Sequence, residues 1–397
     1  MKILFTGGGT GGHIFPIIAI TREIKKISPQ KIEFLYVGPK DEWALPLLPP
    51  EGIKVRTILA GKIRRNLGPR EILLNIIDSF KLILGIFQAF FWVFIENPDL
   101  VFSKGGYGSI PVALNADILQ VPLFLHESDI VPGLANKILG KLALEIFVSF
   151  PMTEYFDPKK IMLVGNPIRE EILEGSKEEA KELFKLSKEK PVLLILGGSQ
   201  GAQRINDLIL LVLSELLEDF EVLHQTGSKN FKQVKAEAKV VIGENLEKYY
   251  HPLPFFLEPD LKQALAIADL VISRAGSGGI FEIAACGKPS ILIPLPEAAQ
   301  NHQVKNAYAY SKNGAAMVIE EANLAPHFFL ERVKFLFSRP DILKEMSQKA
   351  KEFARPRAAA IIANYLLEYL TLEISHSQIG IDGIRKNRHN KANESGN

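Results

Sequence analysis

The first residues with evident chemical potential form the loop GGGTGGH, which follows the apolar stretch KILFT. Glycines let backbone N–H groups approach an oxyanion at the start of the next helix. His13 ends this loop, and an imidazole can take or give a proton near neutral pH. We therefore predict that His13 transfers a proton beside a bound phosphate or sugar. A helix-capping or merely polar histidine is the alternative.

The same loop matches the dinucleotide-binding fingerprint G-x-G-x-x-G through Gly7, Gly9 and Gly12. That fingerprint also requires an acidic residue at the end of the second strand, where it binds ribose hydroxyls. Here the second apolar stretch, IEFLYVG, continues into Pro39 and Lys40, and Asp41 comes late. The pattern therefore argues against a nicotinamide cofactor.

Two further glycine-rich loops carry polar side chains. Ser199 and Gln200 lie in LILGGSQGAQRIN, which suits a phosphate or sugar contact or else a tight turn without a ligand. Residues 275–279 lead into a helix whose start suits a diphosphate, and Glu282 could accept two ribose hydroxyls or merely complement the helix dipole. A polar cluster at 300–303 could read sugar hydroxyls.

The elements that position these loops follow from the alternation of short apolar stretches with helix-length segments, which is typical of parallel sheets covered on both faces. The predicted strands are KILFT, IEFLYVG, KVRTI, LVFSK, PLFLHE and EIFVSF, then PVLLILGG, FEVLHQTG, KVVIG, LVISRAG and SILIPL. Because the pattern restarts after GNPIR, we predict an α/β chain of two Rossmann-like domains whose parallel sheets face an interdomain cleft. The predicted parts are residues 1–166, residues 167–354, a C-terminal helix at 355–372 that packs back on the first domain, and a disordered tail at 373–397.

The composition is that of a folded enzyme. Apolar residues make up 47% and charged residues 23% of the 397 residues, and the net charge of +2 gives no argument for nucleic acid. Cys286 is the single cysteine, which excludes an internal disulfide and fits a reducing compartment. The N-terminus lacks a signal-peptide pattern, so a cytoplasmic location is expected.

One segment, residues 72–95, is unusually apolar. Its cleanest run, Leu82 to Ile95, has fourteen residues, too few to span a bilayer, which needs about 20. Its polar residues form one narrow stripe on a helix, made of Asn75, Asp78, Lys81 and Gln88, with Gly85. The basic stretch GKIRRNLGPR precedes the apolar segment. A basic cluster beside a broad apolar face suits attachment to an anionic membrane surface. An ordinary buried helix covering a sheet is the alternative.

Taken together, the motifs resemble those of the MurG family, which belongs to glycosyltransferase family 28. The resemblance runs from Met1 to about Thr371 and rests on GGGTGGH, GGYGSIP, HESD..PGLANK, GNPIR, GGSQGA..IN, SRAGSGGIFE and NHQ..NA. It implies the GT-B fold and an inverting transfer of N-acetylglucosamine (GlcNAc) from UDP-GlcNAc to the 4-hydroxyl of lipid I, undecaprenyl-diphospho-N-acetylmuramoyl-pentapeptide, for peptidoglycan synthesis. The implied location is the cytoplasmic face of the plasma membrane, with other cell-wall proteins as partners.

The resemblance also implies roles for individual residues. His13 is the expected base and Glu127 a second catalytic residue, while His302 and the backbone near residues 254–256 are less certain substrate contacts. The expected substrate-binding residues are Thr10, Gly11, Gly12, His126, Asp129, Arg169, Ser199, Ala275, Gly276, Ser277, Gly278, Gly279, Glu282 and Gln303. The chain has no D-x-D motif, so no metal or cofactor is expected, and helix N-termini would stabilise the leaving group.

Two departures from the family pattern bear on specificity. The family usually has H-E-Q-N where this chain has His126-Glu127-Ser128-Asp129, and Gln300 replaces a common acid. An ionised Asp129 accepts hydrogen bonds from a sugar but cannot donate them. The alternatives are another GT-B transferase with a lipid acceptor, a UDP-GlcNAc 2-epimerase using carboxylates such as Glu127 and Asp129, and an inactive membrane scaffold.

Overall fold

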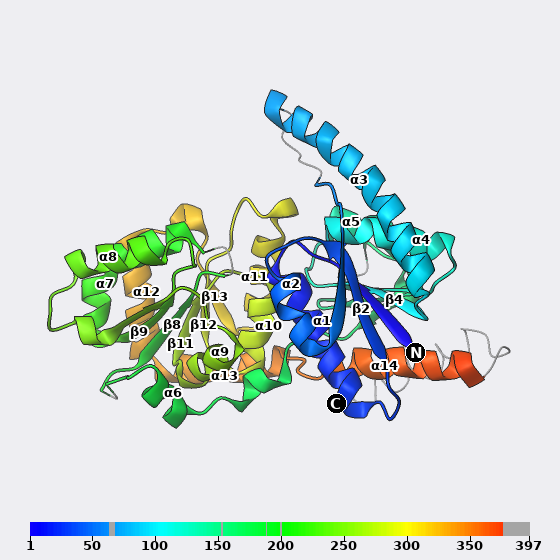
Figure 1. The fold of residues 1–397 in the computed structure, drawn as a ribbon. Helices are drawn as coiled ribbons and strands as arrows, with labels where there is room; N and C mark the ends of the chain where they lie inside the picture. The colour runs from blue at the N-terminus through cyan, green and yellow to red at the C-terminus, as the bar shows by residue number, and fades with distance from the viewer. Residues whose placement is uncertain (63–67, 152–153, 188, 199–200, 376–397) are drawn as a thin grey trace.

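A computed structural model describes residues 1–62, 68–151, 154–187, 189–198 and 201–375. Within these residues the chain forms two parallel sheets side by side, which confirms the predicted pair of Rossmann-like domains (Figure 1). The first sheet has the order β3-β2-β1-β4-β5-β6-β7. Its strands are β1 (Lys2–Thr6), β2 (Glu33–Pro39), β3 (Ile53–Ile58), β4 (Leu100–Ser103), β5 (Leu123–Glu127), β6 (Glu145–Val148) and β7 (Ile161–Leu163).

The second sheet has the order β10-β9-β8-β11-β12-β13. Its strands are β8 (Val192–Leu196), β9 (Glu221–Gln225), β10 (Tyr250–Leu253), β11 (Leu270–Ser273), β12 (Ser290–Leu292) and β13 (Ala316–Val318). The predicted strand KVVIG was wrong, because Lys239 to Val241 end a helix whose Val234 and Ala238 are buried at helical spacing. The edge strand is instead β10, which contains Pro252, a residue that sheets tolerate at their edges.

Helices cover both faces of each sheet. In the first domain they are α1 (Gly11–Ile27), α2 (Ala44–Leu47), α3 (Pro69–Glu96), α4 (Ile110–Ile118) and α5 (Leu134–Leu142). In the second domain they are α6 (Lys177–Leu183), α7 (Gln203–Asp219), α8 (Phe231–Val241), α9 (Glu258–Ile267), α10 (Ser277–Ala285), α11 (His302–Ser311), α12 (Pro326–Ser338) and α13 (Pro340–Phe353). Both α1 and α10 begin directly after glycine-rich turns, as the loops predict.

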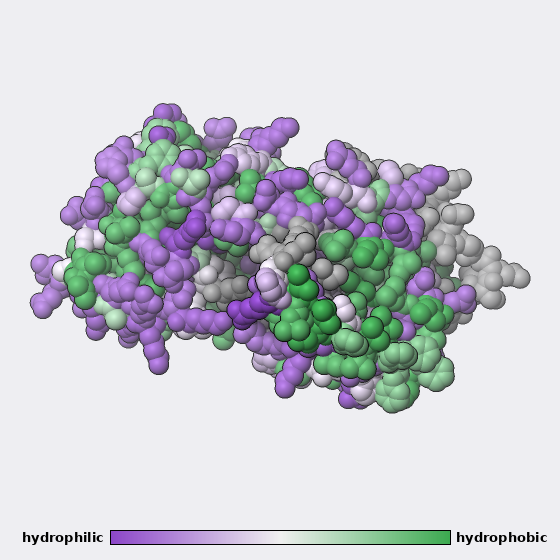
Figure 2. Space-filling model, turned by 90° about the horizontal axis from the view of Figure 1, so that it is seen from above, coloured by the Kyte–Doolittle hydropathy of each residue, from purple (hydrophilic) through white to green (hydrophobic). Residues whose placement is uncertain are grey.

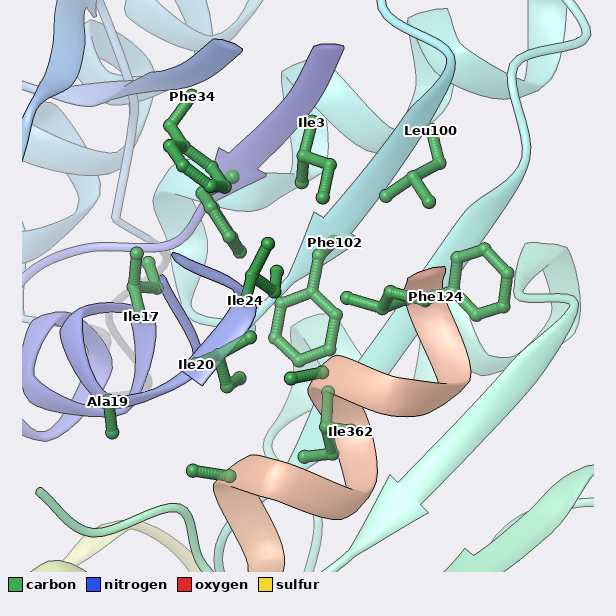
Figure 3. Close-up of a cluster of buried hydrophobic side chains, with 14 of the residues drawn as sticks. Ile3, Ile17, Ala19, Ile20, Ile24, Phe34, Leu100, Phe102, Phe124 and Ile362 are labelled. Atoms are coloured by element: carbon green, nitrogen blue, oxygen red, sulfur yellow. The ribbon is translucent and has the colours of Figure 1, made fainter. Parts of the chain in front are cut away.

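The last helix, α14 (Ala358–Ser375), crosses back and packs on the first domain beside α1 (Figure 1). Its Ile362 points into the same cluster as Phe102 of β4 and Phe124 of β5 (Figure 3). The Tyr365 hydroxyl donates to the buried Glu145 carboxylate over 2.8 Å. The tail predicted to be disordered lies, from residue 376 on, outside the described residues.

Helix α3 stands out from the first domain (Figure 1). It has 28 residues, more than the fourteen-residue run that it contains, and is long and apolar enough to cross a membrane by length and composition alone. Most of the polar stripe faces the protein: Gln88 Oε1 accepts from Leu59 N over 2.7 Å, and Asp78 and Gly85 are buried, while Lys81 is exposed. The apolar face is exposed instead, through Ile72, Leu73, Ile76, Ile77, Phe80, Ile83, Leu84, Phe87, Phe90, Phe91, Phe94 and Ile95.

Candidate active site

A cavity of about 970 Å³ lies between the two sheets, at the carboxyl ends of their strands. These ends meet where the strand order reverses, beside β1/β4 and β8/β11, which is where open α/β sheets bind ligands. The cavity is lined by most residues expected from sequence: Thr10, Gly11, Gly12, His13, Glu127, Asp129, Arg169, Gly276, Ser277, Gly278, Gly279, Glu282 and Gln303. His126 and Ala275 are fully buried and do not line it, and Ser199 lies outside the described residues.

His13 sits in the cavity wall with its two ring nitrogens in different surroundings. Thr10 Oγ1 lies 3.2 Å from Nδ1, while Nε2 faces the backbone at Gly106. Burial and, to a smaller extent, the Lys104 charge lower the pKa of His13 to about 4, although Asp41 opposes both. The imidazole is therefore neutral at physiological pH, as a base that accepts a proton must be.

Asp41 lies too far beyond the end of β2 to be the ribose-binding acid of the fingerprint, but it has a structural function in the loop that follows β1. One carboxylate oxygen accepts from Gly9 N over 3.1 Å. The other accepts from Trp43 N and Ala44 N at the start of α2. Asp41 thus ties the glycine loop to the helix after β2. The sequence contained the residue, but nothing in its spacing indicated the contact.

Glu127 shapes its own loop. Its Oε1 accepts from Asp129 N over 2.9 Å, and its Oε2 accepts from Asn136 Nδ2 over 2.7 Å and from Gly133 N over 3.3 Å. Burial and the neighbouring Asp129 charge raise the pKa of this carboxyl. Both oxygens are engaged within the first domain, so Glu127 holds the loop after β5, and the catalytic role implied by the resemblance stays a prediction.

The residues after Glu127 bind the second domain. Asn306 of α11 donates from Nδ2 to Asp129 Oδ1 over 2.8 Å and accepts from Ile130 N over 3.0 Å. The Ser277 hydroxyl donates to the Ser128 carbonyl over 2.6 Å. Asp129 was expected to touch a sugar, but here its carboxylate joins the two domains. Asn306, present in the NHQ..NA motif, was not predicted as a site residue.

His126 serves the domain junction and not the cavity. Its Nε2 lies 3.1 Å from the carbonyl oxygen of Gly165, where the chain leaves the first domain. Burial and the Lys104 charge lower its pKa well below the ordinary value, so the ring is neutral. The buried His126 side chain does not line the cavity, and its expected contact with substrate stays a prediction.

The donor side of the cavity is built around the start of α10. Glu282 Oε1 accepts from Arg169 Nη2 over 3.1 Å, and Arg169 also pairs with Glu258 over 3.2 Å. The Arg169 guanidinium stacks on the ring of Phe15, 4.2 Å from its centre, so a donor-side cation contacts the first domain. Burial raises the pKa of Glu282, and Arg169 opposes this.

The polar cluster after β12 is held in an uncommon backbone conformation. Gln300 and Asn301 have φ values of 59° and 55°, which non-glycine residues adopt rarely. Gln300 donates to the Pro132 carbonyl over 3.1 Å and accepts from Lys137 over 3.0 Å, two contacts across the cleft. Gln303 turns back and accepts from Leu295 N over 3.0 Å.

The apolar face of α3 adjoins the cavity. Leu82 of α3 and Leu134 and Ile138 of α5 line the cavity's rim. From above, Figure 2 shows the hydrophobic residues gathered over α3 and extending toward the hollow between the domains. A ligand with a long apolar part could therefore lie along α3 and α5 with its polar end in the cavity. In the described residues, no group of three or more His, Cys, Asp or Glu is placed to hold a metal ion.

Comparison with known proteins agrees with this arrangement. The glycosyltransferase family 28 N-terminal domain matches residues 3–148, and the family 28 C-terminal domain matches residues 192–362. The chain is 36% identical over 352 residues to the UDP-N-acetylglucosamine--N-acetylmuramyl-(pentapeptide) pyrophosphoryl-undecaprenol N-acetylglucosamine transferase of Clostridium tetani, covering 88% of this chain and 94% of that one. The transferase of the same name from Thermodesulfovibrio yellowstonii is 37% identical over 364 residues, 90% of this chain and 96% of its own.

Solved structures share the fold. MurG of Acinetobacter baumannii superposes with a TM-score of 0.68 at 24% identity, covering 92% of this chain and 99% of that one. A UDP-GlcNAc 2-epimerase from Neisseria meningitidis gives a TM-score of 0.62 at 16% identity, covering 93% and 100%. At these identities the structures show the fold alone. The extended sequence similarity shows more: the chain belongs to glycosyltransferase family 28.

Proposed function

We propose that this enzyme transfers GlcNAc from UDP-GlcNAc to the 4-hydroxyl of the N-acetylmuramoyl sugar of lipid I, giving lipid II. The observation that carries the proposal is the cavity itself, with a neutral His13 on one wall and the start of α10 with Glu282 on the other. Relatives at 36–37% identity over nearly the whole chain bear the name of this activity.

On the donor side, the N-terminus of α10 would face the diphosphate of UDP. Its first N–H groups have no partners within the helix, and the helix dipole favours an anion there. Glu282 would accept the ribose hydroxyls, and Arg169 would balance the phosphate charge. Gln303 would have to leave the Leu295 amide to reach a sugar hydroxyl, because the two are bonded in this structure.

On the acceptor side, His13 would remove the proton from the attacking 4-hydroxyl. The new bond from this oxygen to the anomeric carbon forms as the bond to UDP breaks, so the configuration inverts and UDP leaves as an anion. The proton passes to His13, with the hydroxyl of Thr10 orienting the ring through Nδ1. His13 is suited to this step because its imidazole is neutral beforehand, so one ring nitrogen is free to accept the proton.

The acceptor's lipid explains the exposed face of α3. We propose that α3 lies on the cytoplasmic surface of the plasma membrane, with its apolar side chains among the lipids. A spanning helix would have to immerse its polar stripe as well. On this side α3 is bonded to the first domain, since Gln88 accepts from Leu59 N and the Ile86 carbonyl accepts from Asn115. Arg70, in the first turn of α3, suits an anionic surface.

A transfer assay tests the proposal. Radiolabelled UDP-GlcNAc is incubated with a short-chain lipid I analogue and wild type, His13→Ala or His327→Ala; His327 is an exposed control on α12. We expect label in the lipid product with wild type and control, and a rate about 10²–10⁴-fold lower for His13→Ala, the usual contribution of a general base. Equal rates would remove His13 as the base. Transfer to diacylglycerol instead of lipid I would favour another lipid-directed transferase.

The pH dependence provides a second measurement. Activity is present while His13 is neutral, so kcat/KM should fall on the acidic side as pH drops through the pKa of His13, about 4 in the free enzyme.

A further inference from the structure

A buried lysine lies at the floor of the cavity. Lys104 follows β4, its backbone N–H donates to the Thr6 carbonyl over 2.8 Å, and its side chain is 2% exposed. It nevertheless lines the cavity. The ammonium donates to the hydroxyl of Ser128, which donates to Asn166 Oδ1 over 3.0 Å.

Among the described residues, no carboxylate lies within 4.0 Å of this ammonium. The two nearest acids are engaged elsewhere, since Glu127 is bonded to its own loop and Asp129 to Asn306. Burial lowers the pKa of Lys104 below its ordinary value, and the charges of these two acids offset this lowering only in part. A buried cation without a close counter-ion is costly, so an anion entering the cavity would find a partner here.

Lys104 and His13 flank the same glycine. A Cβ built on Gly7 would lie 3.3 Å from the Cβ of Lys104 and 3.4 Å from that of His13. The charged groups that face His13 are Lys104, which disfavours its protonation, and Asp41, which favours it. Tyr107, from the loop after Lys104, contacts Gly9 and completes the surroundings.

We propose that Lys104 is the cationic contact for the diphosphate of the acceptor, and that through this contact acceptor binding prepares His13 to take the acceptor's proton. This inference rests on the proposed function. Before an anion binds, the ammonium adds to burial in keeping the imidazole neutral. A bound diphosphate balances the ammonium, and the affinity of His13 for a proton rises when the hydroxyl to be deprotonated is in place.

The position of Lys104 favours the acceptor's diphosphate over the donor's. Lys104 belongs to the wall that carries the first glycine loop, whereas Arg169 and the start of α10 form the donor side. UDP should therefore leave the Lys104 site open. A second diphosphate, added when UDP is already saturating, should still act on His13.

The direct test is an NMR titration of the His13 ring in protein with ¹³C-labelled histidine, the signal being assigned with His13→Gln. Spectra are recorded with saturating UDP, with and without inorganic pyrophosphate, for wild type, Lys104→Met and Lys104→Gln. The matched control is Lys141→Met, which removes an exposed charge from α5 in the same domain. Lys104→Gln keeps a polar contact for Ser128 should the methionine variant fail to fold.

In wild type and the control, we expect the His13 pKa to be low and to rise by about one unit with pyrophosphate, a tenfold change in proton affinity. In both Lys104 variants it should be higher from the start and respond little to pyrophosphate. Identical titrations in wild type and the Lys104 variants, or a pyrophosphate response that survives in them, would overturn the inference.

Kinetics separate this inference from the proposed function. Transfer by wild type tests the function itself, whatever Lys104 does. For Lys104→Met we expect the KM for the lipid I analogue to rise at least about tenfold while the KM for UDP-GlcNAc stays unchanged. A rise in the KM for UDP-GlcNAc alone would assign Lys104 to the donor diphosphate and contradict the inference.

Discussion

The exposed face of α3 makes a quantitative prediction about membrane binding. Phe80, Phe87 and Phe94 recur every seven residues and are 66%, 71% and 64% exposed, so they lie on one side of the helix. Replacing all three with serine removes the largest outward side chains without touching the stripe that packs on the domain. Trp92 would be a poor choice, because its ring stacks 4.6 Å from the Arg56 guanidinium.

The size of the effect follows from area. A phenylalanine presents about 200 Å², and at about 25 cal/mol per Å² the exposed two-thirds of each ring contribute about 3 kcal/mol if wholly immersed. If each ring enters the membrane surface only to half its depth, its transfer contributes about 1.5 kcal/mol, which changes the partition coefficient roughly tenfold per ring. The triple variant should therefore bind vesicles at least about 100-fold more weakly, even if the contributions are not fully additive.

Co-sedimentation with vesicles containing anionic lipid measures this partitioning. The matched control replaces Leu211, Val240 and Leu257, which are 70%, 86% and 58% exposed on the second domain, with serine. Melting temperatures establish that both variants are folded. Unchanged binding of the α3 variant, or an equal loss in the control, would refute the assignment of α3 as the membrane face.

Two further predictions concern packing and the donor. Gly85→Ala should lower the free energy of unfolding by about 1–3 kcal/mol, because the added Cβ would lie 1.9 Å from the Leu59 carbonyl oxygen. Thermal melting checks this against Gly133→Ala, where the added Cβ meets open space. Equal melting temperatures of the two variants would contradict the prediction. Glu282→Gln should raise the KM for UDP-GlcNAc about 10–100-fold with a smaller change in kcat, since hydrogen bonds to a charged group contribute about 1.5–3 kcal/mol. An unchanged KM in steady-state kinetics would exclude the ribose contact.

The sequence predicted the fold well because parallel strands buried on both faces have a strong signature. Short β-branched stretches and glycine-rich turns located β1, β8 and β11 and the helices that follow them. The failures are at the edges. The strand expected at KVVIG is the end of α8, where valines pack at helical spacing, and the three-residue β7 and β13 are too short to carry a period.

The orientation of α3 shows a different limit. The sequence shows a narrow polar stripe on an otherwise apolar helix, and the polar face of an amphipathic helix usually faces water. It faces the domain, because Gln88 bonds the Leu59 amide and Asn115 bonds the Ile86 carbonyl, while Gly85 allows close approach. These partners lie 29 residues away in the sequence, so no local pattern could identify them.

The same separation explains why motif positions predicted the location of the site better than the function of its residues. His126, Glu127 and Asp129 all lie where the motif places them, yet the structure engages them with Gly165, with their own loop and with Asn306. Asp129 accepts the Asn306 amide, whereas an asparagine there could present either end of its amide. The acid at this position therefore acts first on how the two domains meet. Its effect on sugar choice would follow from that geometry, since Asn306 also donates to the carbonyl of Ala275, the first residue of the loop that leads into α10.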